Sequence, residues 1–131
     1  MNILIAALIL AETEGVPNPP PGDHGKAFGP LQIHQEVVDD VNRHYGTKYR
    51  LIDVNDIRVA RWVCSAYISI YATPKAIGRS VTDQDRARIW NGGPKGWKKK
   101  STIRYWRKVE RKMKVVKIAE FSPSWEMARA A

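Results

Sequence analysis

Two stretches decide the fold: Glu12-Thr13-Glu14-Gly15 and, after a loop rich in glycine and proline, Gly25-Lys26-Ala27-Phe28-Gly29-Pro30-Leu31-Gln32-Ile33. The first ends an apolar segment that predicts a helix over residues 2–13, with Asn2 as its N-terminal cap. This helix is apolar on nearly every side, which predicts a central place in the core. The second stretch predicts a tight turn, because glycine permits backbone conformations that other residues resist.

The rest of the chain predicts a mainly α protein of five to six helices, with at most a small β-hairpin near residues 27–33. Apolar spacing, capping residues and breakers give the remaining helices. These are residues 34–45 with Val37, Val38, Val41 and Tyr45 inward and Gly46 as the stop, a helix capped by Asn55 with Ile57, Ala60, Cys64, Tyr67, Ile68 and Tyr71 inward, a short helix at 74–78, one opened by Thr82 with Asp85 and ending near Trp90, and a long one opened by Ser101.

Length and composition indicate one folded domain. The chain has 131 residues, of which 44% are hydrophobic, enough to bury a core without disulfides. The single cysteine, Cys64, cannot form an intrachain disulfide and lies in an apolar helical run, so we expect it to be inert packing. We assign residues 1–119 to the domain and 120–131 to a C-terminal extension.

The apolar N-terminus allows two interpretations. Residues 1–11 have the length of a signal-peptide core, but no basic residue precedes them. They are too short for a bilayer-spanning helix, which needs about 20 apolar residues. We favour a buried first helix, since cleavage after Ala11 would remove the helix that ends in Glu12.

Basic residues are unevenly distributed. The net charge is +9, no lysine or arginine precedes Lys26, and residues 95–117 hold a dense basic run that includes Trp97. A basic face suits a polyanion such as nucleic acid, anionic lipid or a bacterial wall, or it is simply a solvated helix face. No helix-turn-helix, zinc-finger or RNA-recognition signature is present, so nucleic acid is not expected as the main partner.

Glu12 and Glu14 are the candidate acids. Glu12 follows an apolar run at a helix C-terminus, where burial and the negative end of the helix dipole both raise a carboxyl pKa. Glu14 should point to another side, nearer solvent, although both could be exposed helix-end glutamates. Gln32, within the turn, offers both a donor and an acceptor.

These motifs resemble the lysozyme-like superfamily, in particular soluble lytic transglycosylase domains and similar phage and bacterial muramidases. The similarity covers about residues 3–110. It rests on Glu12-Thr13, Gly29-Pro30-Leu31-Gln32-Ile33, Trp90-Asn91-Gly92-Gly93 and Tyr105 with Val109. Two departures from the family pattern are Trp90 in place of tyrosine and Gly92 in place of alanine.

The resemblance implies a lysozyme-like single domain that cleaves β-1,4 bonds between N-acetylmuramic acid and N-acetylglucosamine in peptidoglycan. Glu12 would be the general acid and Gln32 a ligand of the sugar. Trp90 and Asn91 would form the cleft wall, and Tyr105 would hydrogen-bond to the glutamate. Counting back from Gln32 without a gap favours Glu14 as the acid. We prefer Glu12 because it sits directly on the apolar helix.

Asp23 bears on the type of reaction. Gly22-Asp23-His24-Gly25 before the turn also resembles invertebrate-type lysozymes, whose second carboxylate lies just ahead of it. A second carboxylate could stabilise the cationic transition state, act as nucleophile or activate water. Without one, the substrate's acetamide could assist and give an anhydro-sugar, as in transglycosylases. Asp23 could instead be a loop cap, so hydrolase and transglycosylase both stay open.

No cofactor is expected, and the ten-residue intervals between His24, His34 and His44 match no metal site. Of the adjacent Asp39 and Asp40, one should face solvent while the other could pair with Arg43. We expect a monomer without a membrane span that acts on glycan strands at the bacterial wall or periplasm, with anionic wall polymers as a further candidate partner. Phage encoding and export without a clear signal peptide are both consistent with this. The rival is a catalytically silent basic module that binds wall or nucleic acid.

Overall fold

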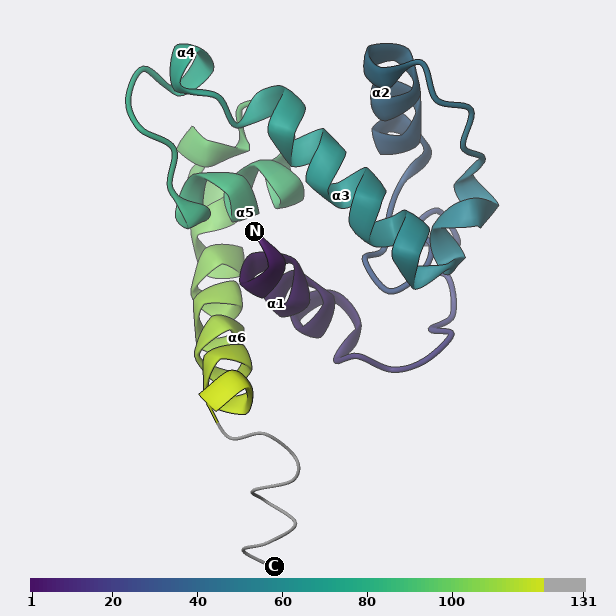
Figure 1. Ribbon diagram of the computed structural model, residues 1–131, viewed down its shortest axis with the longest axis horizontal. Helices are drawn as coiled ribbons and strands as arrows, with labels where there is room; N and C mark the ends of the chain where they lie inside the picture. The colour runs from purple at the N-terminus through teal and green to yellow at the C-terminus, as the bar shows by residue number, and fades with distance from the viewer. Residues whose placement is uncertain (122–131) are drawn as a thin grey trace, which may run out of the picture.

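The computed structural model describes residues 1–121, and within them the chain is mainly α-helical, as predicted (Figure 1). The elements in order are α1 (Asn2–Thr13), α2 (Gln35–Tyr45), η1 (Leu51–Asn55), α3 (Ile57–Tyr71), α4 (Pro74–Ile77), α5 (Asp83–Gly92), η2 (Gly96–Lys98), η3 (Lys100–Thr102) and α6 (Ile103–Phe121). Isolated bridges Gly22–Ala27 and Phe28–Ile33 are the only β-pairing in this part of the chain. Most of the predicted extension, from residue 122 onward, lies outside the described residues.

Helix α1 forms the centre of the core, as its apolar sequence predicts. It packs along α6 and also contacts α3 and α5. Leu4 and Leu8 are almost fully buried on it. Figure 1 shows α3 crossing the molecule, with α2 and η1 towards one end and α5 towards the other.

Three helix starts differ from the predictions, and at α3 and α6 a neighbouring residue makes the deciding contact. Asn2 is the first residue of α1, not its cap. Asp56, not Asn55, caps α3, accepting from the Arg58 amide at 2.8 Å, while Asn55 ends η1. Ser101 lies in η3 and does not open α6, because Thr102 is drawn inward and donates to the Gly96 carbonyl at 2.7 Å.

Two side chains expected in the core are instead substantially exposed. Tyr45 is 44% exposed and Ile57 is 47% exposed. Both lie at the end of a helix, where periodicity places a side chain on the correct face but neighbouring elements cover it only in part; Tyr45 packs edge-on against Trp62 of α3. The other predicted inward residues of α2 and α3 are buried or half-buried.

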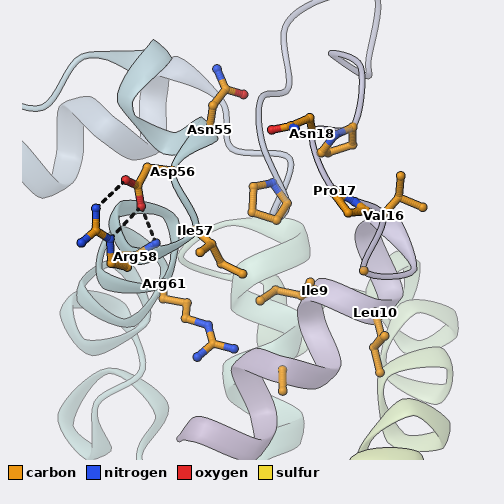
Figure 2. A pocket seen from close by; sticks show the side chains of 14 residues that line it. Ile9, Leu10, Val16, Pro17, Asn18, Asn55, Asp56, Ile57, Arg58 and Arg61 are labelled. Carbon is orange, nitrogen blue, oxygen red and sulfur yellow. Dashed lines mark hydrogen bonds and ion pairs between the residues drawn. The ribbon is translucent and has the colours of Figure 1, made fainter.

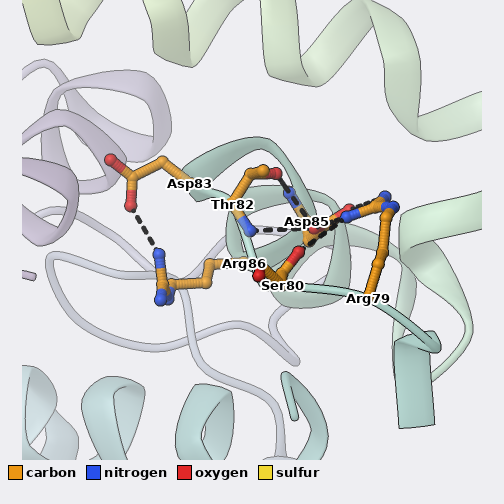
Figure 3. Close-up of polar contacts among 6 residues, drawn as sticks. All are labelled: Arg79, Ser80, Thr82, Asp83, Asp85 and Arg86. Carbon is orange, nitrogen blue, oxygen red and sulfur yellow. Dashed lines mark hydrogen bonds and ion pairs between the residues drawn. The ribbon is translucent and has the colours of Figure 1, made fainter. Parts of the chain in front are cut away.

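The start of α5 forms the capping box predicted from Thr82 and Asp85, reinforced by an arginine from outside the helix (Figure 3). The Asp85 carboxylate, only 2% exposed, accepts from the Thr82 amide at 2.9 Å and from two Arg79 nitrogens at 2.7 and 2.9 Å. These contacts, led by the Arg79 bond, lower the Asp85 pKa to about 2. The network fixes the start of the helix whose other end carries Trp90 and Asn91.

Candidate functional site

Glu12 lies half-buried in the last turn of α1. The Tyr105 hydroxyl of α6 donates a hydrogen bond to Glu12 Oε1 at 2.9 Å. Burial raises the pKa of Glu12. The Tyr105 bond and the charges of Lys108 and His34 lower it, without reversing the shift. The resulting group keeps its proton to a higher pH than an exposed glutamate, which is what proton donation near neutral pH requires.

The turn carrying Gln32 is held tightly against the rest of the fold. Gly29 has a φ of +77°, and a Cβ there would lie 2.1 Å from the Val54 carbonyl oxygen, so only glycine fits. The Thr13 hydroxyl lies 2.9 Å from the Pro30 carbonyl and fastens the turn to the end of α1. Gln32 itself has a φ of +49°, and its Nε2 donates to the Gly29 carbonyl at 2.9 Å.

These elements bring four distant parts of the chain around one pocket of about 280 Å³. Its lining consists of Glu12, Asp23, Ala27, Gln32, Ile33, His34, Val37, Trp90 and Asn91. Five of the site residues predicted from the sequence therefore line one cavity: Glu12, Asp23, Gln32, Trp90 and Asn91. Tyr105 does not line it but contacts Glu12 from α6. A second hollow of about 260 Å³ adjoins it, sharing Glu12 and Gln32 and continuing past Pro19 and Pro20.

Asp23 enters the pocket with a partner that sequence reasoning missed. Its carboxylate lies 2.7 Å from His34 Nε2, and this bond lowers the Asp23 pKa. The sequence spacing of the histidines bears only on metal binding and gives no sign of this role for His34. The turn at 25–33 folds the chain back, so residues 11 positions apart meet. No spacing rule for a helix or strand indicates that contact.

Glu14 does not line either of the two hollows. It is the left-handed C-cap residue of α1, with a φ of +55°, and this conformation turns its side chain towards α6. There its carboxylate lies 3.0 Å from Lys112 Nζ, an ion pair that lowers the Glu14 pKa. An exposed carboxylate with a lowered pKa is ill suited to donate a proton, so the geometry favours Glu12 over Glu14.

The two adjacent aspartates of α2 have the different surroundings that the sequence suggested: one is paired and the other faces solvent. Asp40 pairs with Arg43 and also accepts a hydrogen bond from the Tyr71 hydroxyl at 2.6 Å. Asp39 is exposed and accepts from Gln35 at 2.9 Å. Neither lines the Glu12 pocket, so both are structural or surface groups.

A larger pocket, of about 710 Å³, lies away from this chemistry (Figure 2). Ile9 and Leu10 of α1 line it together with the loop at residues 15–19 and the start of α3. Figure 2 shows Arg58 turned to Asp56 at its edge, an ion pair of 3.1 Å. None of the residues predicted to take part in catalysis or sugar binding lines this pocket.

Other classes of site find little support in the described residues. No group of three or more histidine, cysteine, aspartate or glutamate side chains among residues 1–121 is arranged to hold a metal ion. Cys64 is fully buried, and burial raises its pKa well above the usual range, as expected for inert packing. No helix in residues 1–121 has both the length and the apolar character needed to cross a bilayer.

Comparison with known proteins finds a sequence relative and a structural neighbour. A lysozyme of Magallana gigas is 35% identical over 81 residues, which are 62% of this chain and 56% of that protein. The chain thus matches little more than half the length of this relative. A chain in the crystal structure of Aeromonas hydrophila PliI in complex with Meretrix lusoria lysozyme superposes with a TM-score of 0.71 at 26% identity, covering 85% of this chain and 88% of that one. No protein-family model matches.

The sequence relative and the structural neighbour agree with the resemblance drawn from the motifs. The chain has a lysozyme-like fold, and its similarity to invertebrate-type lysozymes fits both matches. Neither match points to the lytic transglycosylase branch or to a phage origin.

Proposed function

Because the chain has a lysozyme-like fold, we propose that it is a muramidase: a glycoside hydrolase that cleaves the β-1,4 bond between N-acetylmuramic acid and N-acetylglucosamine in peptidoglycan with water. The observation that carries the proposal is the pairing of two carboxyl groups in one pocket with pKa values shifted in opposite directions. The pKa of Glu12 is raised by burial, and that of Asp23 is lowered by its bond to His34.

Opposite shifts assign different roles to the two carboxyls. Glu12, which keeps its proton to a higher pH, donates it to the bridging oxygen as the bond to the leaving sugar breaks. Asp23, ionised at neutral pH, stabilises the positive charge that develops on the sugar ring. Addition of water to that ring completes hydrolysis, and a proton returns to Glu12.

Tyr105 acts through Glu12 and not on the substrate. The hydroxyl of this half-buried tyrosine donates to Glu12 Oε1 and holds the carboxyl in one orientation. A fixed acid loses less free energy to reorganisation when the proton is transferred. His34 has the same relation to Asp23, since the 2.7 Å bond fixes that carboxylate at the pocket wall.

The remaining lining groups suit a sugar. The half-buried indole of Trp90 offers an apolar face, while Gln32 and Asn91 offer amide donors and acceptors for hydroxyl and N-acetyl groups. The adjoining hollow along Pro19 and Pro20 extends the groove, as an extended glycan strand requires. The proposed place of action is the bacterial cell wall, and the proposed chemistry needs no cofactor.

The test is release of new reducing ends from purified peptidoglycan. We expect release by the wild-type protein and a loss of at least about 10-fold in Asp23→Asn, since a charged transition state loses its counter-charge. Asp39→Asn is the matched control, because Asp39 is exposed and lies outside the pocket. An asparagine there can still accept the hydrogen bond from Gln35.

Equal rates for Asp23→Asn and Asp39→Asn would contradict the role of the second carboxylate. No release by the folded wild-type protein would contradict the whole proposal and would favour a non-catalytic wall-binding module.

A further inference from the structure

The outward face of α6 carries a stripe of cations with two aliphatic side chains among them. We propose that this stripe docks onto an anionic lipid surface. Its members are Arg104, Arg107, Lys108, Arg111, Lys114, Val115 and Ile118, all exposed. The intervals of three and four residues place them on one side of an α-helix.

The stripe lies opposite the face that packs on the core. Val109 is fully buried and Met113 is 8% exposed on that inner face, where Tyr105 also contacts Glu12. Glu120 lies on another side of the helix, whereas Glu110, three residues after Arg107 and four before Lys114, borders the stripe. The stripe's five cations still outnumber this one neighbouring carboxylate. Among the described residues, no ion pair engages any of its five cations. Within residues 1–121, these cations are therefore available to an external partner, although the Lys108 charge also acts on Glu12.

The two aliphatic members decide which polyanion fits. Val115 is 54% exposed and Ile118 is 66% exposed. At a membrane surface such side chains gain by entering the acyl boundary, while flanking lysines and arginines reach the phosphates. A nucleic acid offers them no such gain, and the stripe has no aromatic side chain for stacking on bases.

The dimensions also suit binding parallel to a bilayer. From Arg104 to Ile118 the helix rises about 21 Å at 1.5 Å per residue. All seven side chains can then meet a flat surface at once. Because each lysine or arginine near an anionic membrane adds to binding, five aligned cations give a large share of the affinity.

Vesicle binding by the full chain tests this at moderate ionic strength. We expect binding to large vesicles of phosphatidylcholine with 30% phosphatidylglycerol, and none to phosphatidylcholine alone. The double variant Arg107→Gln/Arg111→Gln should bind about 30-fold more weakly, from the usual contribution of two surface cations. Lys108 is left intact because its charge acts on Glu12.

A charge-matched control removes two exposed cations elsewhere, Lys48→Gln/Lys75→Gln, and should lose less than about 3-fold. Circular dichroism melting should show all variants folded, since each change is on the surface. Equal losses in the two double variants would overturn the proposal, because net charge and not the stripe would then set binding. Failure of the wild type to bind anionic vesicles would overturn it as well.

The aliphatic members provide a second test. Ile118→Ala should weaken vesicle binding about 5-fold, from the methylene groups withdrawn from the boundary. Ile52→Ala is its control, because Ile52 is 58% exposed but lies on η1. If Ile118→Ala leaves vesicle binding unchanged while duplex DNA binds as tightly at the same salt, the stripe is a general polyanion site and the lipid proposal fails. None of these readouts depends on peptidoglycan cleavage.

Discussion

Replacing Glu12 with glutamine should abolish most catalysis while making the protein more stable at neutral pH. Glu12→Gln keeps the size of the side chain and an oxygen that can accept the Tyr105 hydrogen bond, at 2.9 Å in the wild type. It removes only the transferable proton. The packing of α1 against α6 should therefore survive, and any loss of rate reports proton donation.

The magnitude follows from the chemistry of a buried acid. A positioned general acid contributes about 10²–10⁴-fold, so the barrier should rise by about 3–5 kcal/mol at 1.36 kcal/mol per factor of ten. The stability effect has the opposite sign. The folded-state pKa of Glu12 is raised, so its contribution to stability is present at low pH and is lost as pH rises through that pKa. Glutamine does not titrate, so the variant does not lose this stability as the pH rises.

The assay combines two measurements on the same samples. Initial rates of reducing-end release from peptidoglycan give activity, and urea unfolding at acidic and neutral pH gives stability. The variant should match the wild type in stability at acidic pH and exceed it at neutral pH. Glu14→Gln is the matched control, and its rate should stay near wild type because Glu14 is an exposed partner of Lys112. Activity lost in Glu14→Gln but kept in Glu12→Gln would refute the assignment.

Three further changes test the parts that position the site. Tyr105→Phe removes a hydrogen bond that lowers the Glu12 pKa. The alkaline limb of the pH profile of kcat/KM should therefore move to higher pH. An alkaline limb that stays at the wild-type pH would show that Tyr105 does not act on the acid. Asp85→Asn should cost about 2 kcal/mol at neutral pH, from a pKa lowered from 3.8 to about 2. That contribution is present above the unfolded pKa and fades as pH falls through the folded one, so urea unfolding at neutral and acidic pH should show the difference shrinking. Gly29→Ala should lower the free energy of unfolding by more than about 2 kcal/mol, because alanine would be strained at this left-handed φ and its Cβ would clash with Val54. Gly46→Ala, at a similar φ but with open space around it, should cost only about 1 kcal/mol. Equal urea midpoints for the two variants would contradict the clash.

Local sequence signals predicted most of the helices because their causes are local. The apolar run before Glu12 predicted a buried first helix. The Thr82–Asp85 pair predicted the start of α5, and Gly46 predicted the end of α2. At α6 the prediction failed because a non-local contact chose between two neighbouring residues. Ser101 is a residue type that often caps a helix start, but because Thr102 is buried, α6 begins at Ile103, two residues after Ser101.

The candidate site was predicted only as far as its motifs extend. Glu12 and Gln32 belong to recognisable patterns, and the structure brings them into one pocket. The partnership of Asp23 with His34 and that of Asp85 with Arg79 depend on how loops fold back in space. Neither follows a helical or strand period, so no pattern in the sequence could indicate them. The choice of Glu12 over Glu14 likewise needed the left-handed turn that points Glu14 at Lys112.

The most direct test of hydrolytic cleavage is mass spectrometry of soluble products from purified peptidoglycan digested in ¹⁸O-labelled water. We expect the wild-type protein to release muropeptides with hydrated reducing ends that carry one ¹⁸O atom, and Glu12→Gln to release almost none. Anhydro-muropeptides without label would contradict hydrolysis and establish a transglycosylase instead.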